Sequence, residues 1–432
     1  MVLLIVYISR LALDHYRSWN TCLIDLTDSV NVLYGHNGLG KTNIVEAIEF
    51  LSTGSSHRVN SSQPLIQRGY KQATIRANLE IPSQAGSSKQ GSSKQGSFRQ
   101  ESARQTERFT VTIPIRGANR VRVNNNSSLY MRDIVGQIKT VVFSPEDQWL
   151  LSLDPSRRRR FLDDAGIQLM PEYYDLSQKY SHIARQRVAL LKNMGSGQRE
   201  SSADDYTGLE IWTGQLISTG LSLSTMRQKI VEKLSPLFSE IYAQLAGSEH
   251  KAQLAYHPSF AEIFDQSDDP FTLISNHFQR LFPGELAQGR NLIGPHRDDL
   301  DFSLHGMPAK EYASNGEMWT MALALKMALF QLFSENLLSE NNVSPGAGKP
   351  ILILDDVFSQ LDTSRREKIV DFSQQQEQVL VTAASENDIP LEFISNSQAE
   401  VNLCNVEEIK AAADREETIT REFSGGETSY EA

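Results

Sequence analysis

The segment Gly35–Thr42 near the N-terminus combines the residue types that bind the phosphates of a nucleotide. It reads Gly-His-Asn-Gly-Leu-Gly-Lys-Thr and fits the pattern of a phosphate loop. Gly38 and Gly40 let backbone N–H groups point at phosphate oxygens, and the helix that follows presents its positive N-terminus. We expect Lys41 to bind the β- and γ-phosphates and act in catalysis, and Thr42 to place its hydroxyl on Mg²⁺. The residues expected to contact the nucleotide are Gly35, His36, Asn37, Gly38, Leu39, Gly40, Lys41, Thr42 and Asn43.

Two adjacent carboxylates follow an apolar run in the C-terminal third of the chain. Residues 351–354 read Ile-Leu-Ile-Leu, which is typical of a strand buried on both faces of a parallel sheet. Asp355 and Asp356 come next, at the strand end where open α/β sheets bind ligands. Asp355 is suited to hold Mg²⁺ through its water shell, and Asp356 to orient or deprotonate an attacking water. Such acids can also merely solvate a turn, but a phosphate loop in the same chain favours the catalytic reading.

A small polar turn, Ser314–Gly316, opens a long helix that we expect from Glu317. Its apolar positions recur at core spacing, so most of the helix is structural. The turn is a second anion site at a helix N-terminus, one more than a single bound nucleotide needs.

These motifs resemble the ABC-type ATPases of chromosome maintenance, and within that group the bacterial branch that acts in recombination and gap repair. The resemblance rests on the loop, on the Ser-x-Gly-Glu turn and on Leu-Asp-Asp-Val-Phe-Ser-x-Leu-Asp at 354–362. More discriminating matches are spread along nearly the whole chain: Leu-Ser-Thr-Gly-Ser-Ser-His-Arg at 51–58, Phe-Ser-Pro-Glu-Asp at 143–147, Ser-Arg-Arg-Arg-Arg-Phe-Leu-Asp-Asp at 156–164 and Gly-Pro-His-Arg-Asp-Asp-Leu at 294–300.

The resemblance implies ATP and Mg²⁺ as cofactors and a composite site. Ser314, Gly316 and Glu317 of one subunit would contact the ATP bound by another, and residues 359–362 would lie along the subunit interface. It further implies an ATP-dependent homodimer on gapped or junction DNA, or duplex, with weak, DNA-stimulated ATP hydrolysis. Its implied partners are a RecR-type mediator and, indirectly, a RecA-type recombinase.

Two other functions stay open at this point. An ATPase subunit of a membrane transporter would need a coupling surface and a switch His near residue 383, and the sequence shows neither. A small-molecule phosphotransferase would need an acceptor pocket and no signature turn. The signature here has Asn-Gly-Glu where many ABC proteins have Gly-Gly-Gln, which bears on the rate of hydrolysis.

The patterning predicts an α/β fold: an ABC-type ATPase domain with a mixed sheet and an antiparallel β subdomain, plus an inserted helical lobe. Strand, loop and helix follow one another over residues 28–54, and alternating segments at 72–82 and 108–130 predict antiparallel strands. We expect the N-terminal part of the ATPase domain at 1–152, with a flexible insertion at 83–108, and the helical lobe at 153–285, helical from about 155 to about 283. The C-terminal part would span 286–404, and a disordered acidic tail 405–432.

The totals describe an ordinary globular chain of 432 residues with a net charge of −11. Any nucleic acid must therefore be met by a local basic patch. The two cysteines, Cys22 and Cys404, show no pairing or metal spacing, and we expect a reducing cytoplasmic compartment. The apolar start reads as a first strand rather than a signal peptide, and no stretch approaches the roughly 18 apolar residues of a membrane span.

Basic residues in two of the motifs have alternative roles. The run Arg157–Arg160 could contact DNA, but arginines on successive helix positions point in all directions, so pairing of some of them with Asp163, Asp164 or an acid at the subunit interface is favoured. Three roles are likewise open for His57 and Arg58: phosphate sensing, DNA contact and packing.

Overall fold

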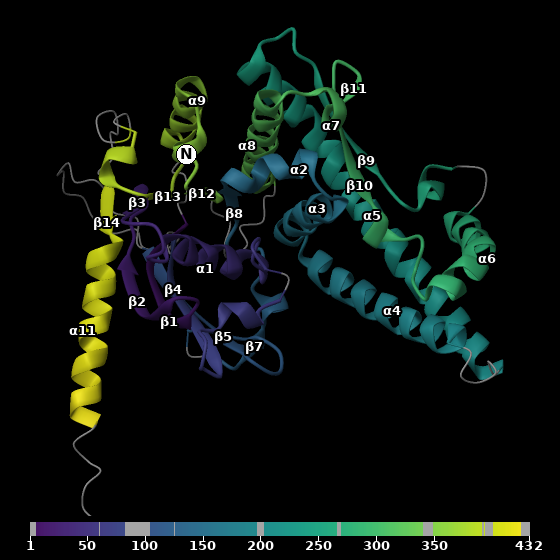
Figure 1. The fold of residues 1–432 in the computed structure, drawn as a ribbon, viewed down its shortest axis with the longest axis horizontal. Coiled ribbons are helices and arrows are strands. Elements are labelled where there is room, and N and C mark those ends of the chain that lie inside the picture. The colour runs from purple at the N-terminus through teal and green to yellow at the C-terminus, as the bar shows by residue number, and fades with distance from the viewer. Residues whose placement is uncertain are drawn as a thin grey trace, which may run out of the picture. The chain divides into compact units, whose positions relative to one another are not determined.

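The computed structural model describes residues 6–59, 61–82, 104–124, 126–196, 203–265, 269–339, 349–390, 393 and 401–424 (Figure 1). The chain forms two compact units. Unit 1 combines Met1–Pro145 with Phe333–Ala432, and unit 2 is Glu146–Leu332. Unit 2 takes in the predicted helical lobe together with the predicted signature residues 314–317.

A five-stranded parallel sheet forms the core of unit 1, in the order β14-β3-β13-β12-β8. The prediction of a strand buried on both faces is confirmed, because every residue of β12 is buried and it pairs in parallel with both β13 and β8. The strands are β3 Val30–Tyr34, β8 Thr140–Phe143, β12 Ile351–Asp355, β13 Val379–Ala383 and β14 Asn402–Asn405, and the helices of this unit include α1 Lys41–Thr53 and α9 Thr363–Gln374.

A six-stranded sheet in the order β2-β1-β4-β5-β6-β7 completes unit 1. Its neighbouring strands pair antiparallel, as predicted. The predicted insertion 83–108 extends too far at its C-terminal end, because residues 104–108 belong to β5 and pair with β4. Residues 83–103 lie outside the described part. The strands are β1 Tyr7–Tyr16, β2 Trp19–Asp25, β4 Gln72–Pro82, β5 Arg104–Pro114, β6 Arg120–Val123 and β7 Leu129–Tyr130.

Unit 2 is mostly helical, but the prediction of uninterrupted helix from 155 to 283, apart from a break near 200, is wrong. Strand β9 Ala252–His257 lies inside that stretch and pairs antiparallel with β10 Asp299–Leu304, which also pairs with β11 Met307–Pro308. Alternation of buried Ala252 and Leu254 with exposed neighbours fits a half-buried strand. The helices are α2 Trp149–Ser152, α3 Pro155–Leu169, α4 Pro171–Gly195, α5 Ala203–Ala246, α6 Pro270–Gln288, α7 Ala309–Tyr312 and α8 Asn315–Ser339, whose last residues belong to unit 1.

Short 3₁₀ turns connect these elements, and one further helix closes the described chain. The 3₁₀ turns are Gln63–Leu65, Met131–Asp133, Pro145–Gln148, Ala261–Phe264, Pro295–Arg297, Phe358–Gln360 and Glu386–Asp388. Among the helices that the structure describes, none has the length and apolar character needed to cross a membrane.

Helix α11, Val406–Ser424, corrects the prediction of disorder from residue 405. Asn405 caps it by accepting hydrogen bonds from the backbone N–H groups of Glu407 (3.0 Å) and Glu408 (3.4 Å). The helix packs along β2, beside which Figure 1 shows it in yellow. Residues 425–432 of the predicted tail lie outside the described part.

The arginine run of α3 is largely structural. Arg158 is buried and pairs with Asp299 at 2.5 Å, while Arg159 donates to the backbone oxygen of Asp298 at 2.9 Å. Arg160 lies 3.9 Å from Asp164, one of the predicted partners. Arg157 lies 3.2 Å from Glu146. The run therefore ties α3 to its own unit.

Arg227 of α5 is the centre of this ionic cluster. It is buried and donates to Asp163 (2.7 Å), to Asp298 (2.8 Å) and to the hydroxyl of Tyr173 (3.0 Å). The two carboxylates balance the charge of the Arg227 guanidinium and, with the Tyr173 hydroxyl, accept its hydrogen bonds, as burial of a guanidinium requires. The motifs at 156–164 and 294–300 thus meet in one buried network.

Both cysteines are buried and free, in agreement with their spacing. Burial raises the pKa of the Cys22 thiol to about 12 and that of Cys404 to about 11. Neither thiol is therefore a ready nucleophile.

A second buried pair in unit 2 yields a stability prediction. Arg187 donates to Glu285 at 2.6 Å, and their side chains are 2% and 0% exposed. Glu285→Gln leaves the guanidinium without its counter-charge and should lower the free energy of unfolding of unit 2 by about 3 kcal/mol. Urea unfolding followed by tryptophan fluorescence measures this, with the exposed Glu210→Gln on α5 as the control. Equal midpoints for the two variants would show that the buried pair adds no stability.

Candidate nucleotide site

The phosphate loop joins β3 to α1 and depends on glycine for its shape. Gly38 and Gly40 have φ angles of 88° and 102°, which L-residues with side chains rarely adopt. A Cβ on Gly40 would lie 2.7 Å from both the Ser18 hydroxyl and the Trp19 indole nitrogen. That indole donates to the backbone oxygen of Gly40 at 3.1 Å, so β2 fixes the end of the loop.

Lys41 is buried against the start of the same loop. Its ammonium donates to the backbone oxygens of Gly35 at 2.5 Å and His36 at 3.0 Å. Burial lowers its pKa, while the negative charges of Asp356 and Asp355 oppose that shift. These two hydrogen bonds hold the Lys41 ammonium inside the loop that is predicted to wrap a polyphosphate.

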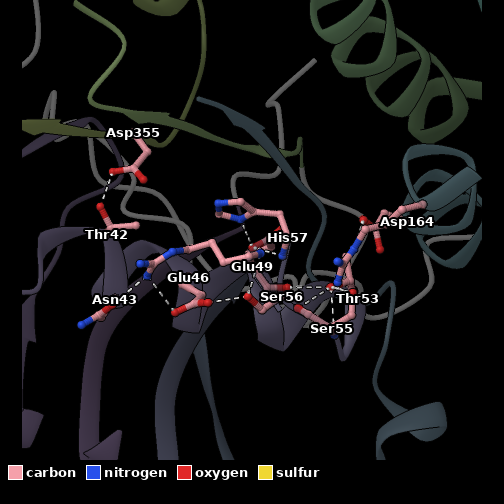
Figure 2. Close-up of polar contacts among 12 residues, drawn as sticks. Thr42, Asn43, Glu46, Glu49, Thr53, Ser55, Ser56, His57, Asp164 and Asp355 are labelled. Atoms are coloured by element: carbon pink, nitrogen blue, oxygen red, sulfur yellow. Dashed lines mark hydrogen bonds and ion pairs between the residues drawn. The ribbon is translucent and has the colours of Figure 1, made fainter. Parts of the chain in front are cut away.

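Thr42, Asp355 and Thr382 form a chain of hydrogen bonds across the carboxyl ends of the strands. Figure 2 shows Thr42 donating to Asp355, at 3.1 Å. Thr382 of β13 donates to the same carboxylate oxygen at 2.7 Å. Burial raises the pKa of Asp355, and these two hydrogen bonds act against the rise. Two residues predicted as metal ligands are therefore brought together.

These two residues offer donors that suit Mg²⁺. A hydroxyl and a carboxylate are hard oxygen ligands, and Mg²⁺ is usually bound by one or two side chains, several waters and substrate phosphates. Within the described residues there is no cluster of three or more His, Cys, Asp or Glu side chains that could hold a metal by themselves. One hydroxyl and one carboxylate fit a Mg²⁺ ion whose remaining ligands are waters and nucleotide phosphates.

Asp356 sits directly after this buried carboxylate in a left-handed conformation with φ 52°. Its N–H donates to the Thr382 hydroxyl at 2.9 Å, and its backbone oxygen accepts from Ser359 at 2.9 Å. Such conformations persist only where the surroundings hold them, and they are common at functional sites. Asp356 thus lies at the bend that follows β12, next to the predicted metal ligand Asp355.

Polar side chains of α1 contact basic residues from outside the helix (Figure 2). Figure 2 shows His57 beside Glu49, and its Nδ1 lies 2.6 Å from Oε2 of that carboxylate. Arg58 donates to the side-chain oxygen of Asn43 at 2.9 Å. Arg17 donates to both oxygens of Glu46, at 2.5 and 2.9 Å. Asn43, expected to contact the nucleotide, thus has its side-chain oxygen directed to Arg58.

The predicted signature residues lie at the N-terminus of α8 in unit 2, and this helix begins at Asn315 rather than at the predicted Glu317. Ser314 donates from its backbone N–H (2.8 Å) and hydroxyl (2.7 Å) to Glu317, whose own N–H donates to the Ser314 hydroxyl at 3.3 Å. This reciprocal arrangement is a capping box. Hydrogen bonds from Ser314 lower the pKa of Glu317. Glu317 therefore has a local structural role, and Gly316 directly follows the first residue of α8.

Sequence reasoning missed three residues around the loop: Trp19, Thr382 and Glu407, whose carboxylate accepts a hydrogen bond from the His36 N–H at 3.3 Å. Thr382 carries a weak signal, because it is the polar residue at the end of an apolar run that pairs in parallel with β12. Trp19 is distant in sequence from the loop and had no signal. Glu407 belongs to the segment predicted as disordered.

Gly40 gives a direct test of the loop geometry. Gly40→Ala forces a side chain against Ser18 and Trp19, so nucleotide affinity should fall at least tenfold. Gly69→Ala is the matched control, because Gly69 has a similar φ of 95° but open space around the added Cβ and no place in the loop. Titration with a fluorescent ATP analogue measures both. If the two variants bind alike, the close approach at Gly40 is unimportant for binding.

Comparison with known proteins places this site in a family. Residues 7–392 match the model of the RecF/RecN/SMC N terminal domain. The chain is 49% identical over 413 residues to the DNA replication and repair protein RecF of Bifidobacterium adolescentis, covering 94% of this chain and 92% of that one. It is 50% identical over 387 residues to RecF of Bifidobacterium longum subsp. infantis, covering 89% and 87%.

A solved structure agrees with these sequence relatives. The recombination mediator protein RecF-ATPrS in the RecFOR pathway superposes with a TM-score of 0.74 at 25% identity, covering 89% of this chain and 94% of that chain. The fold expected from the motifs, an ABC-type ATPase fold with mixed helices and sheets, is confirmed. Together with the loop and the paired carboxylates, these similarities show that the chain belongs to the RecF family of DNA replication and repair proteins.

Proposed function

We propose that this chain is an ATP-dependent DNA-binding protein of recombinational repair and replication-fork maintenance. The observation that carries the proposal is a relative named for DNA replication and repair, 49% identical, of which the alignment covers 92%. The solved relative named RecF-ATPrS supports ATP as the nucleotide. A transporter ATPase is not favoured, since these relatives are named for DNA repair.

Each residue of the nucleotide site has a proposed role. Lys41 and the loop N–H groups bind the phosphates, with Lys41 stabilising charge as the terminal phosphate leaves. Thr42 and Asp355 would hold Mg²⁺, which would supply charge neutralisation on the phosphates. Asp356 orients the attacking water and accepts its proton, and Thr382 positions both acids.

ATP would also join two copies of the chain. Ser314, Gly316 and Glu317 would close over the ATP of the partner, with residues 359–362 at the interface. A nucleotide that binds the dimer better than the monomer stabilises the dimer in proportion to that preference. Slow, DNA-stimulated hydrolysis would then release the complex.

The antiparallel sheet of unit 1 carries a surface suited to DNA. We call Arg108, Arg116, Arg120 and Arg122 the arginine surface. All four are exposed, and within the described part of the chain none has a carboxylate at ion-pair distance. Between residues 104 and 133 the sequence has six arginines and two acids, in a chain whose net charge is −11. Such a local patch is what phosphate binding requires of an acidic protein.

We also propose protein partners for the chain, by analogy with its relatives. The solved relative is named a recombination mediator in the RecFOR pathway. We therefore propose a RecR-type mediator as the direct partner and a RecA-type recombinase as the indirect one, on gapped or junction DNA in the cytoplasm.

Two variants test the nucleotide cycle by the mass of the protein in solution. Lys41→Ala removes a phosphate contact and should stay monomeric with ATP, whereas wild type becomes a dimer. Asp356→Asn should still dimerise but hydrolyse ATP at least tenfold more slowly, because the group that activates water is lost. Lys229→Ala, exposed on α5, is the control. A persistent Asp356→Asn dimer with unimpaired turnover would contradict the role of Asp356.

The arginine surface has its own test. Arg120→Gln with Arg122→Gln should weaken duplex binding about tenfold and reduce the salt dependence of log K by about two. The matched control is Arg10→Gln with Arg76→Gln, which removes the same charge from arginines already paired with Asp25 and Asp14. Fluorescence anisotropy at several salt concentrations, with ATP, gives both quantities. Equal losses in the two double variants would mean that net charge alone governs binding.

A further inference from the structure

Helix α11 reaches the phosphate loop, although it lies far from the loop in the sequence. A Cβ on Gly35 would lie 3.5 Å from the side chain of Glu407 and 3.6 Å from that of Val406. The first turn of α11 therefore lies directly beside the start of the loop. Glu407 Oε1 accepts a hydrogen bond from the backbone N–H of His36 at 3.3 Å and lies 3.4 Å from its imidazole.

Glu407 and Lys41 hold opposite ends of one peptide group. The backbone oxygen of Gly35 and the N–H of His36 belong to the same planar unit. Lys41 donates to that oxygen at 2.5 Å, and Glu407 accepts from that N–H at 3.3 Å. A cation at the oxygen and an anion at the hydrogen both favour this one orientation of the peptide dipole. The loop start is thus fixed before any nucleotide arrives.

The same face of α11 also acts on the far end of the loop. Lys410 follows Glu407 by three residues, so the two side chains lie on one side of the helix. Its ammonium donates to the backbone oxygen of Ser18 at 3.3 Å and lies 4.9 Å from the centre of the Trp19 ring. Trp19 in turn donates to Gly40. Both ends of the loop are therefore connected to the first two turns of α11.

From these contacts we propose that α11 braces the phosphate loop, and that Glu407 is a positioning residue for ATP binding. The brace lowers the entropy that the loop must lose when it closes on phosphates. Because coupling between two equilibria is reciprocal, bound ATP must also stabilise the docked position of α11. The inference rests on the ATP-binding part of the proposed function and is independent of DNA.

Affinity for ATP in three variants of the full chain tests the role of Glu407. Glu407→Ala removes the hydrogen bond to His36, so ATP should bind about fivefold more weakly. Glu407→Gln keeps an acceptor and removes a negative charge near the polyphosphate, so its affinity should equal or exceed that of wild type. Glu408→Ala is the matched control, because Glu408 contacts the cap residue Asn405 instead of the loop. It weakens the same helical turn and should leave ATP affinity within about twofold of wild type.

The outcomes separate this inference from the proposed function. Weak binding by Glu407→Ala with recovery in Glu407→Gln supports the brace, as does slower hydrogen exchange in α11 when ATP is added. If wild type binds ATP and Glu407→Ala binds equally well, or if Glu408→Ala is equally weak, the inference is wrong and the proposed function stands. If wild type itself does not bind ATP, the nucleotide part of the proposed function fails.

Discussion

The hydrogen bonds that converge on Asp355 hold together segments that lie far apart in the sequence. Thr42 follows the loop after β3, Asp355 ends β12 and Thr382 lies in β13. Parallel pairing brings the carboxyl ends of these strands together, because Asp355 is in register with Thr382, and Thr382 is in register with Leu33. A buried carboxylate without such donors would favour its neutral form, which cannot bind a cation. The end of the loop at Thr42, the predicted metal ligand Asp355 and the left-handed Asp356 are all connected by this arrangement.

The parts of the site that could be predicted from the sequence are those in which the chemistry is local. A phosphate loop needs its glycines, Lys and Thr in one short segment, and a buried strand followed by two acids is equally compact. Thr382 could not be predicted in the same way, because one Thr at a strand end is common and its role depends on strand order. Strand β9 was missed for a related reason: its alternation is short and becomes informative only when β10 pairs with it.

Charged segments were the hardest to interpret, because the same residue types serve solvation, ligand binding and buried pairing. The arginines at 157–160 have the composition of a nucleic-acid patch, yet Arg158 is buried against Asp299. The segment after 405 has the composition of a disordered tail, yet it forms a helix whose polar side chains meet β2 and the loop. In both segments the structure depends on a partner far away in the sequence, Asp299 for Arg158 and the Trp19 ring for Lys410.

The order of strands in the parallel sheet has a consequence for synthesis of the protein on the ribosome. Strand β3 lies between β14 and β13, and both of these come from the last quarter of the chain. The strand that carries the phosphate loop therefore has no sheet neighbour until residues 379–383 of β13 have been synthesised. Unit 2 is one continuous segment and can fold while the rest is still being made, since domains generally fold as units during synthesis. A nascent chain that has not reached β13 thus lacks the strands that flank β3, and the proposed ATP binding would have to wait for them.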